Sequence, residues 1–136
     1  MKKLIFIDDS AMDHFILKRI LNKYKLAYDV TCTSNGEEVI NFLDKNKQAK
    51  GVLPDIILLD IYMPKFDGWD FLERISYVYP GLIKPFKIYM LSSSINPADI
   101  NHAMQYPFVK SFIFKPITKE TLERLIIEVA PDISEA

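Results

Sequence analysis

Cysteine, histidine and glycine are all scarce in this chain of 136 residues. The single cysteine, Cys32, excludes an internal disulfide and a cysteine-rich metal site, and such sparse use of cysteine is typical of a reducing cytoplasm. The two histidines, His14 and His102, have no second histidine or cysteine at ligand spacing, so we expect them at the surface or at helix caps. With only four glycines, the chain contains neither a GxGxxG motif nor a P-loop.

Long apolar runs and an excess of either charge are also absent. The 17 Lys and Arg residues nearly balance the 18 Asp and Glu residues, so the net charge of −1 favours neither nucleic acid nor an anionic membrane. The apolar run at residues 4–7 ends at Asp8, which is too early for the core of a signal peptide. No other run approaches the length that spans a bilayer. We therefore expect a cytoplasmic protein without membrane insertion or direct DNA binding.

The composition that remains is that of one folded domain. Hydrophobic residues make up 49% of the chain and charged residues 26%, which is enough apolar material for a core. No internal repeat, low-complexity tract or linker is evident. We assign residues 1–131 to this domain and residues 132–136 to a short tail, which leaves no room for an output domain.

Five short apolar runs alternate with five longer amphipathic stretches along the chain. The runs, which we predict as strands, lie at residues 4–7, 28–33, 56–59, 86–91 and 112–114. Three of the predicted helices begin at the caps Ser10, with Asp13 three residues on, Asn35 and Asn96. The third predicted helix begins near Trp69, and the last one runs from Thr118 to Ala130. Their predicted apolar faces include Phe15 in the first helix, Phe42 in the second and Val129 in the last.

This alternation is typical of an α/β fold in which helices cover both faces of a parallel sheet. The run at residues 56–59 is the most hydrophobic and indicates a central strand buried on both faces. We therefore predict a flavodoxin-like, doubly wound (βα)5 fold with strand order 2-1-3-4-5. In such a sheet, ligands bind at the carboxyl ends of the strands where the winding direction reverses, so reactive side chains are expected where the strands end.

Four of the five predicted strands end in a charged or hydroxyl side chain. Asp8 and Asp9 follow the first strand, Asp60 the third, Ser92 the fourth and Lys115 the fifth. In the predicted order the first and third strands are neighbours, so the three carboxylates are expected to crowd together. Three carboxylates and one ammonium sum to a formal charge of about −2, which requires a further counter-charge. A site made of oxygen ligands favours a hard divalent cation such as Mg²⁺.

In order and in context, these residues resemble the signature of response-regulator receiver domains from two-component signalling. The matching motifs are Asp8-Asp9, Asp60 followed by Met63-Pro64 and Gly68, then Ser92, then Lys115-Pro116. The resemblance covers essentially the whole chain and implies a stand-alone receiver that modifies itself and is not a turnover enzyme. It also implies that Asp60 accepts a phosphoryl group from a sensor histidine kinase or a histidine phosphotransfer protein. The domain is then expected to signal by a conformational change to a protein partner or to act in a phosphorelay.

The resemblance assigns a role to each charged residue of the site. It implies that Asp9, Asp60 and the backbone carbonyl of Tyr62 hold Mg²⁺, with Asp8 helping through water. Lys115 is expected to neutralise charge on the transferring oxygens, because phosphoryl transfer is mostly positioning and electrostatics. Asp60, Lys115 and Ser92 are therefore expected to carry the chemistry, beside the metal site.

Two further residues, Ser92 and Phe112, are expected to form the switch, and both depart from the commonest family pattern. Ser92 stands where many receivers have threonine, and it keeps the hydroxyl that would bond the phosphoryl group. Phe112 is the aromatic that would then pack inward, without the phenolic hydroxyl that is common in the family. Bulky Tyr62 flanks the acceptor where attacking water must pass, so we expect it to slow loss of the phosphoryl group.

Receivers usually meet their protein partners at one side of the sheet. We expect a downstream protein target to contact the helix between Asn96 and Tyr106, the fifth strand and the last helix. The alternative for any single residue there is an ordinary solvated helix surface.

Three other functions share parts of the pattern. A flavin or dinucleotide binder would need a phosphate loop after the first strand, where Asp8 and Asp9 repel phosphate. A phosphatase of the haloacid dehalogenase type would need a second acid two residues after its nucleophile, where this chain has Tyr62. A receiver fold kept only as an adaptor would bind partners without phosphorylation, and the crowded acidic pocket argues against it.

Overall fold

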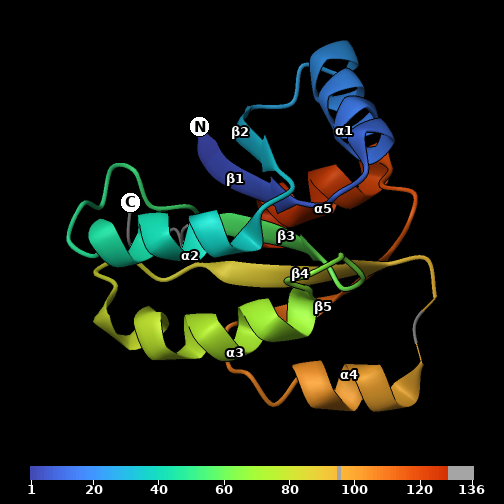
Figure 1. Cartoon of the computed structure of the whole chain (residues 1–136). Coiled ribbons are helices and arrows are strands. Elements are labelled where there is room, and N and C mark those ends of the chain that lie inside the picture. The colour runs from blue at the N-terminus through green and yellow to red at the C-terminus, as the bar shows by residue number, and fades with distance from the viewer. Residues whose placement is uncertain (95, 129–136) are drawn as a thin grey trace.

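Five strands form the sheet of the computed structural model, which describes residues 1–94 and 96–128. The strand order is β2-β1-β3-β4-β5, and every neighbouring pair is parallel (Figure 1). In chain order the elements are β1 (Lys2–Ile7), α1 (Ala11–Lys23), β2 (Tyr28–Thr33), α2 (Gly36–Lys45), β3 (Ile56–Asp60), α3 (Gly68–Val78), the 3₁₀ turn η1 (Tyr79–Gly81), β4 (Lys87–Ser92), α4 (Pro97–Ala103), β5 (Val109–Phe114) and α5 (Lys119–Glu128). This arrangement confirms the predicted flavodoxin-like (βα)5 fold.

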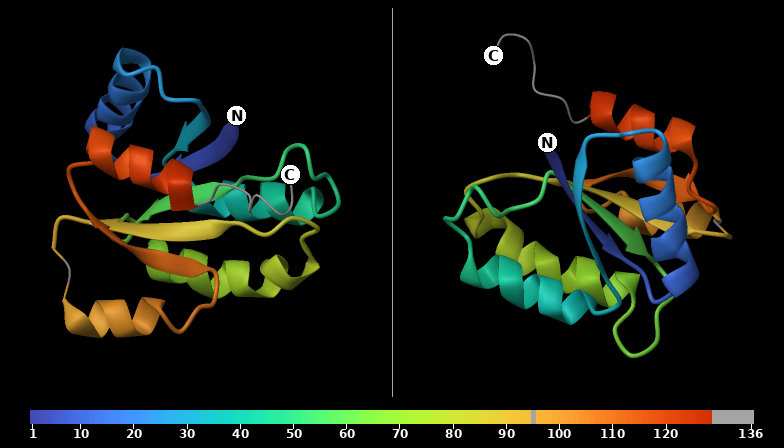
Figure 2. Two further views of the ribbon diagram at one scale, coloured as in Figure 1. Left: turned by 180° about the vertical axis from the view of Figure 1, so that it is seen from behind. Right: turned by 90° about the horizontal axis from the view of Figure 1, so that it is seen from above.

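Helices cover both faces of the sheet. α1 and α5 lie on one face, and α2, α3 and α4 lie on the other, as Figures 1 and 2 show together. Side chains of β3 alternate between the two layers, because Ile57 and Leu59 join the core under α2 and α3 while Ile56 and Leu58 join the core under α1 and α5. All five residues of β3 are buried, as predicted for a central strand.

Side-chain caps start all five α-helices, including α5, where Thr118 accepts a hydrogen bond from the backbone N–H of Thr121 at 3.2 Å. Ser10, Asn35 and Asn96 were predicted as caps, and each accepts a hydrogen bond from the backbone N–H three residues further on, at 3.2, 3.1 and 2.9 Å. Asp67 and Asp70 form a reciprocal capping box at the start of α3, with hydrogen bonds of 2.9 and 3.0 Å that the sequence reading missed. These caps explain why the helices begin where they do, directly after the loops at the carboxyl edge of the sheet.

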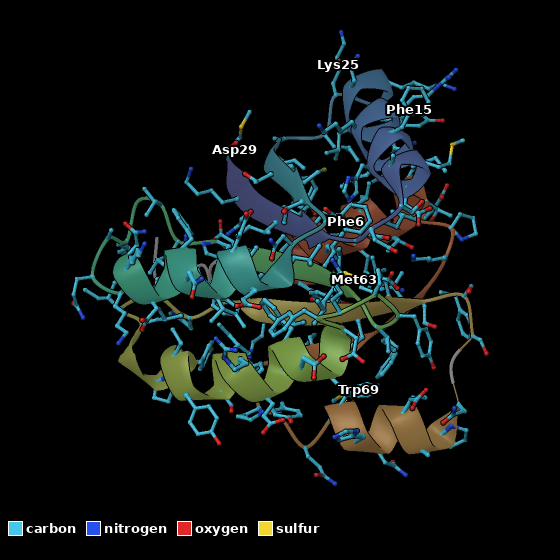
Figure 3. All side chains as sticks on the ribbon, viewed as in Figure 1. Phe6, Phe15, Lys25, Asp29, Met63 and Trp69 are labelled. Carbon is cyan, nitrogen blue, oxygen red and sulfur yellow. The ribbon has the colours of Figure 1, made fainter. Side chains whose placement is uncertain are left out.

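Two aromatic residues predicted for buried helix faces are exposed instead. Phe15 is 58% exposed on the outer side of α1 (Figure 3), and Phe42 of α2 is 40% exposed. The buried residues of α1 are Leu17 and Leu21, one turn apart on the face that meets the sheet. Phe15 precedes Leu17 by two residues, which is about 200° around the helix, so its ring points away from the core.

Some element boundaries also differ from the predictions. β5 begins at Val109, three residues before the predicted start at Phe112, because Val109 and Ser111 pair with β4 on either side of a register shift at Lys110. The turn η1 around Pro80 was not predicted. Val129 and Ala130 of the predicted last helix, and the predicted tail, lie outside the described residues.

The two histidines lie in different surroundings. His14 is half-buried rather than at the surface, because its ring packs edge-on against Phe6 with centroids 5.1 Å apart. His102 is exposed and stacks on Trp69 with centroids 4.2 Å apart. Since Trp69 is on α3 and His102 on α4, this stack joins the two helices (Figure 3).

The described helices are short. α1 has 13 residues, and within residues 1–94 and 96–128 no helix combines the length and apolarity needed to cross a membrane.

Gly68 begins α3 directly against the strand end that carries Asp60. A Cβ at this position would lie 2.8 Å from the Cα of Ile61 and 2.9 Å from the carbonyl oxygen of Asp60. Because these neighbours are backbone atoms, we expect Gly68→Ala to lower the free energy of unfolding by about 1–3 kcal/mol in chemical denaturation. Gly51→Ala is the matched control, since nothing lies within 4 Å of its added Cβ. Equal denaturation midpoints for the two variants would contradict this expectation.

Candidate functional site

The strand ends bring the predicted site residues to one edge of the sheet. Asp8 follows β1, Asp60 ends β3, Ser92 ends β4 and Lys115 follows β5. β1 and β3 pair directly, so Asp8 and Asp60 are neighbours across the two central strands. The strand order therefore produces the convergence that the sequence predicted.

Lys115 lies at the centre of this group. Its Nζ is 2.9 Å from Oδ2 of Asp8, 3.0 Å from Oδ2 of Asp13 and 3.5 Å from Oδ1 of Asp60. The side chain of Lys115 is 19% exposed, and those of Asp8 and Asp60 are 0% and 6% exposed. Water therefore screens these charges poorly, and their interaction is stronger than that of a surface ion pair.

Asp8, Asp9 and Asp60 form the predicted carboxylate cluster. One oxygen from each lies within 4.8 Å of the other two, with Asp8 and Asp60 buried and Asp9 exposed. Oδ1 of Asp8 accepts a hydrogen bond from the backbone N–H of Ser10 at 2.9 Å. Its buried Oδ2 is 2.9 Å from Nζ of Lys115, an ion pair that offsets its charge, and it has no other partner among the described residues.

Burial dominates the protonation of this cluster. It raises the pKa of Asp60 to about 6, and the charge of Asp8 adds to this effect, while Lys115 and the backbone N–H of Tyr62 oppose it. Burial also raises the pKa of Asp8 against the opposing effect of Lys115. For Lys115 itself, burial lowers the pKa, but the hydrogen bonds to Asp8 and Asp13 outweigh it and raise the pKa above its ordinary value. Lys115 therefore stays charged while the carboxylates compete for it.

The donor set of the cluster fits a hard divalent cation. All three side chains offer carboxylate oxygens, which Mg²⁺ prefers, and the buried Oδ2 of Asp8 has Lys115 as its one partner among the described residues, so it can accept a further positive charge. One lysine does not balance three acids, so a further positive charge is favourable here. The structure thus supports a divalent-metal site at Asp8, Asp9 and Asp60, while the ligand role of the Tyr62 carbonyl stays a prediction.

The two predicted switch residues, Ser92 and Phe112, both lie near this edge, and each has a different kind of contact. The hydroxyl of Ser92 donates to the carbonyl oxygen of Ser94 at 2.7 Å and accepts from the N–H of Ser94 at 3.1 Å. To reach a group on Asp60, it has to leave Ser94. Phe112 is half-buried and packs against the core under α2 and α3. Their roles in switching stay predictions.

Tyr62 connects the loop after β3 to the start of α4. Its ring is 60% exposed, and its hydroxyl donates to Oδ2 of Asp99 at 3.3 Å. The same oxygen accepts from the side-chain amide of Asn96 at 3.1 Å. The charge of Asp99 raises the pKa of the Tyr62 hydroxyl. No sequence pattern indicated this link between the acceptor loop and α4.

Asp13 also belongs to the site, although the sequence reading used it only as part of the capping pattern after Ser10. Burial raises the pKa of Asp13, but the hydrogen bond and charge of Lys115 outweigh burial and lower it. The signal that could have found Asp13 is its place in the first turn of α1, four residues after Asp9 and next to the strand ends. An acid near a helix N-terminus already has a structural explanation, which is why the pattern alone does not indicate more.

Fold and site together are those of a receiver domain. The family model of the response regulator receiver domain matches residues 4–127. The chain therefore belongs to the response-regulator receiver family of two-component signalling, which confirms the resemblance.

Individual relatives agree with this assignment. The chemotaxis protein CheY of Thermotoga maritima is 32% identical over 117 residues, which is 85% of this chain and 86% of that protein. The two-component response regulator ORR1 of Oryza sativa subsp. japonica is 26% identical over 90% of this chain, and the chain spans about half of that relative's length, 53%. A two-component response regulator from Cytophaga hutchinsonii, a solved structure, matches with a TM-score of 0.81 at 27% identity, over 93% of this chain and 95% of that one.

The raised pKa of Asp60 makes the stability of the metal-free protein depend on pH. Between the ordinary carboxyl pKa of 3.8 and about 6, the folded protein keeps a proton on Asp60 that the unfolded chain has lost. By linkage, this group lowers the free energy of unfolding as the pH rises through that window, by about 1–3 kcal/mol in total.

Urea denaturation in EDTA from about pH 4 to pH 7 measures this effect. Asp60→Asn carries no such charge, so its stability relative to wild type should increase as the pH rises through the window. A constant difference between the two proteins across this range would show that Asp60 does not titrate as expected.

Proposed function

We propose that this protein accepts a phosphoryl group on Asp60 from a phosphohistidine of a sensor histidine kinase or phosphotransfer protein, and then signals to a protein partner. One observation carries the proposal. The buried Asp60 carboxylate lies 3.5 Å from Lys115 and within 4.8 Å of oxygens of Asp8 and Asp9. A nucleophile beside a fixed cation and a site for a divalent metal is the arrangement that phosphoryl transfer needs.

Asp8, Asp9 and Asp60 would hold Mg²⁺, together with the backbone carbonyl of Tyr62. When bound, the ion would neutralise negative charge on the phosphoryl oxygens. Lys115 would supply a second positive charge from the chain itself, since its raised pKa keeps it protonated.

The proposed step balances as a simple displacement. A carboxylate oxygen of Asp60 attacks the phosphorus of the donor phosphohistidine, and the new O–P bond forms as the P–N bond breaks. The electron pair of that bond leaves with the donor imidazole. With a pKa of about 6, Asp60 is largely ionised at neutral pH and can attack. The product is an acyl phosphate on the protein itself, so the domain is not a turnover enzyme.

The alternative is a receiver-fold adaptor that binds partners without being phosphorylated. Burying the carboxylates of Asp8 and Asp60 opposes folding, as their raised pKa values indicate. A pure scaffold has no physical need for such a pair beside Lys115. The buried acids therefore favour the phosphoacceptor.

Two exposed apolar surfaces support contact with protein partners. In the first half of α1, the helix that follows Asp8 and Asp9, Met12 and Phe15 are 66% and 58% exposed, and we expect a phosphodonor to contact them. Ile100 of α4, Met104 directly after α4 and Phe114 of β5 are 39%, 48% and 64% exposed. This second surface is the one expected for a downstream target, between Asn96 and Tyr106 and along the fifth strand, with the last helix beside it. Chemical-shift changes that spare Met12 and Phe15 on adding a phosphotransfer protein would contradict the assignment of the first surface to the phosphodonor.

We also propose that this exchange takes place in the cytoplasm. The free, half-buried thiol of Cys32 is consistent with a reducing compartment.

A small phosphodonor tests the proposed function directly. With acetyl phosphate and Mg²⁺, the wild-type protein should gain one phosphoryl group in intact-mass spectrometry. Asp60→Asn removes the nucleophile and should abolish the gain. The exposed Asp44, which pairs with Lys47, supplies the control Asp44→Asn, and that variant should react like wild type. An unchanged mass for the wild-type protein would favour the adaptor instead.

The ring of Tyr62 should set how long the phosphoryl group persists. We expect Tyr62→Gly to lose the group several-fold faster than wild type, because water can then reach Asp60 past the missing ring. Tyr62→Phe keeps the ring but removes the hydrogen bond to Asp99, so it separates shielding by the ring from the tether to α4. The lifetime is measured by the decay of the phosphorylated mass after the donor is removed. A Tyr62→Gly variant that decays no faster than wild type would refute the shielding role.

A further inference from the structure

Asp13 contacts the site, yet neither the metal cluster nor the proposed transfer uses it. Its Oδ2 accepts a hydrogen bond from Nζ of Lys115 at 3.0 Å, whereas the same Nζ is 3.5 Å from Oδ1 of Asp60. Lys115 therefore lies closest to Asp8 and Asp13, toward α1, and further from the acceptor. Of the three carboxylates that can bind the Lys115 ammonium, Asp13 lies closer to it than Asp60 does, so Asp13 influences where the ammonium lies.

The first turn of α1 places Asp13 where it can hold Lys115. Ser10 caps the helix and accepts a hydrogen bond from the backbone N–H of Asp13 at 3.2 Å. The side chains of Asp13 and Lys115 are only 23% and 19% exposed, so their ion pair is partly shielded from water. Because charged, partly buried hydrogen bonds are stronger than exposed ones, Asp13 can determine where the Lys115 ammonium rests.

The position of Lys115 matters because it and a divalent cation need the same oxygens. Nζ of Lys115 is 2.9 Å from Oδ2 of Asp8, the buried oxygen that otherwise has no hydrogen-bond partner among the described residues. Asp8, Asp9 and Asp60 carry a formal charge of −3, which Lys115 reduces to −2 and Asp13 returns to −3. Without Asp13, Lys115 would turn toward Asp60 and occupy the cluster more fully.

We propose that Asp13 is a positioning residue for Lys115. It holds the ammonium on the α1 side of the site, between Asp8 and Asp13, and thereby keeps it away from Asp60, so that Asp60 and Asp9 stay open to a divalent cation. This inference rests on the proposed use of Mg²⁺, but it adds a residue and a role that the transfer chemistry does not require.

The test is Mg²⁺ affinity, measured by isothermal titration calorimetry on the full chain without any phosphodonor. Asp13→Asn should weaken Mg²⁺ binding about tenfold, because it removes a charge and also releases Lys115. Asp13→Glu keeps the charge and should stay within about threefold of wild type. Asp29→Asn is the matched control, since Asp29 also pairs with a lysine, Lys3 at 2.9 Å, but lies outside the site. It should bind Mg²⁺ like wild type.

A double-mutant cycle separates positioning from a simple charge effect. If Asp13 acts through Lys115, Asp13→Asn should weaken binding less in a Lys115→Met background, by about threefold or less. An equal effect in both backgrounds would overturn the proposal and leave only a long-range charge. A crystal structure of metal-free Asp13→Asn gives a second measurement, in which Nζ of Lys115 should lie closer to Asp60 than 3.5 Å. An unmoved Lys115 would also overturn it.

These outcomes are distinguishable from a failure of the proposed function. If wild type neither binds Mg²⁺ nor gains a phosphoryl group, the function itself is wrong. If wild type does both and Asp13→Asn binds Mg²⁺ equally well, the positioning role alone is wrong.

Discussion

One ammonium group among crowded carboxylates is the constraint on which the functional edge of this protein depends. Lys115 lies within 3.5 Å of oxygens of Asp8, Asp13 and Asp60, and water screens little of their charge. The pKa of Asp60, raised to about 6, shows that the lysine does not fully offset burial and repulsion. A site in this condition gains stability from any added cation, and this links its electrostatics to its chemistry.

The parallel sheet is what concentrates these charges. Its central strand β3 is apolar along its length and buried on both faces, so Asp60 at its end is held rigidly. The neighbouring β1 delivers Asp8 and Asp9, and α1 then turns Asp13 back toward the same edge. The tight start of α3 at Gly68 lets the loop after Asp60 close against the sheet. Backbone topology, rather than any local motif, therefore creates the site.

Sequence patterns predicted most of this architecture, because strand and helix periodicities and capping residues are local signals. They failed where burial of a residue depended on the direction in which its side chain points. Phe15 was predicted to be buried and is exposed, because α1 presents Leu17 and Leu21 to the sheet instead. The first residues of β5 were missed because polar residues can pair in an edge strand without apolar alternation.

The sequence by itself determined which side chains follow the strands, namely the acids, the hydroxyl and the lysine, and the order in which they occur along the chain. The receiver family followed from that order. Only the tertiary structure decided which partners each group takes: Lys115 bonds to Asp13, a residue 102 positions away in the chain, and Ser92 bonds to Ser94. The physical reason is that differences of a few tenths of an ångström in the distances between side chains decide which groups pair. Packing of segments far apart in the chain sets those distances.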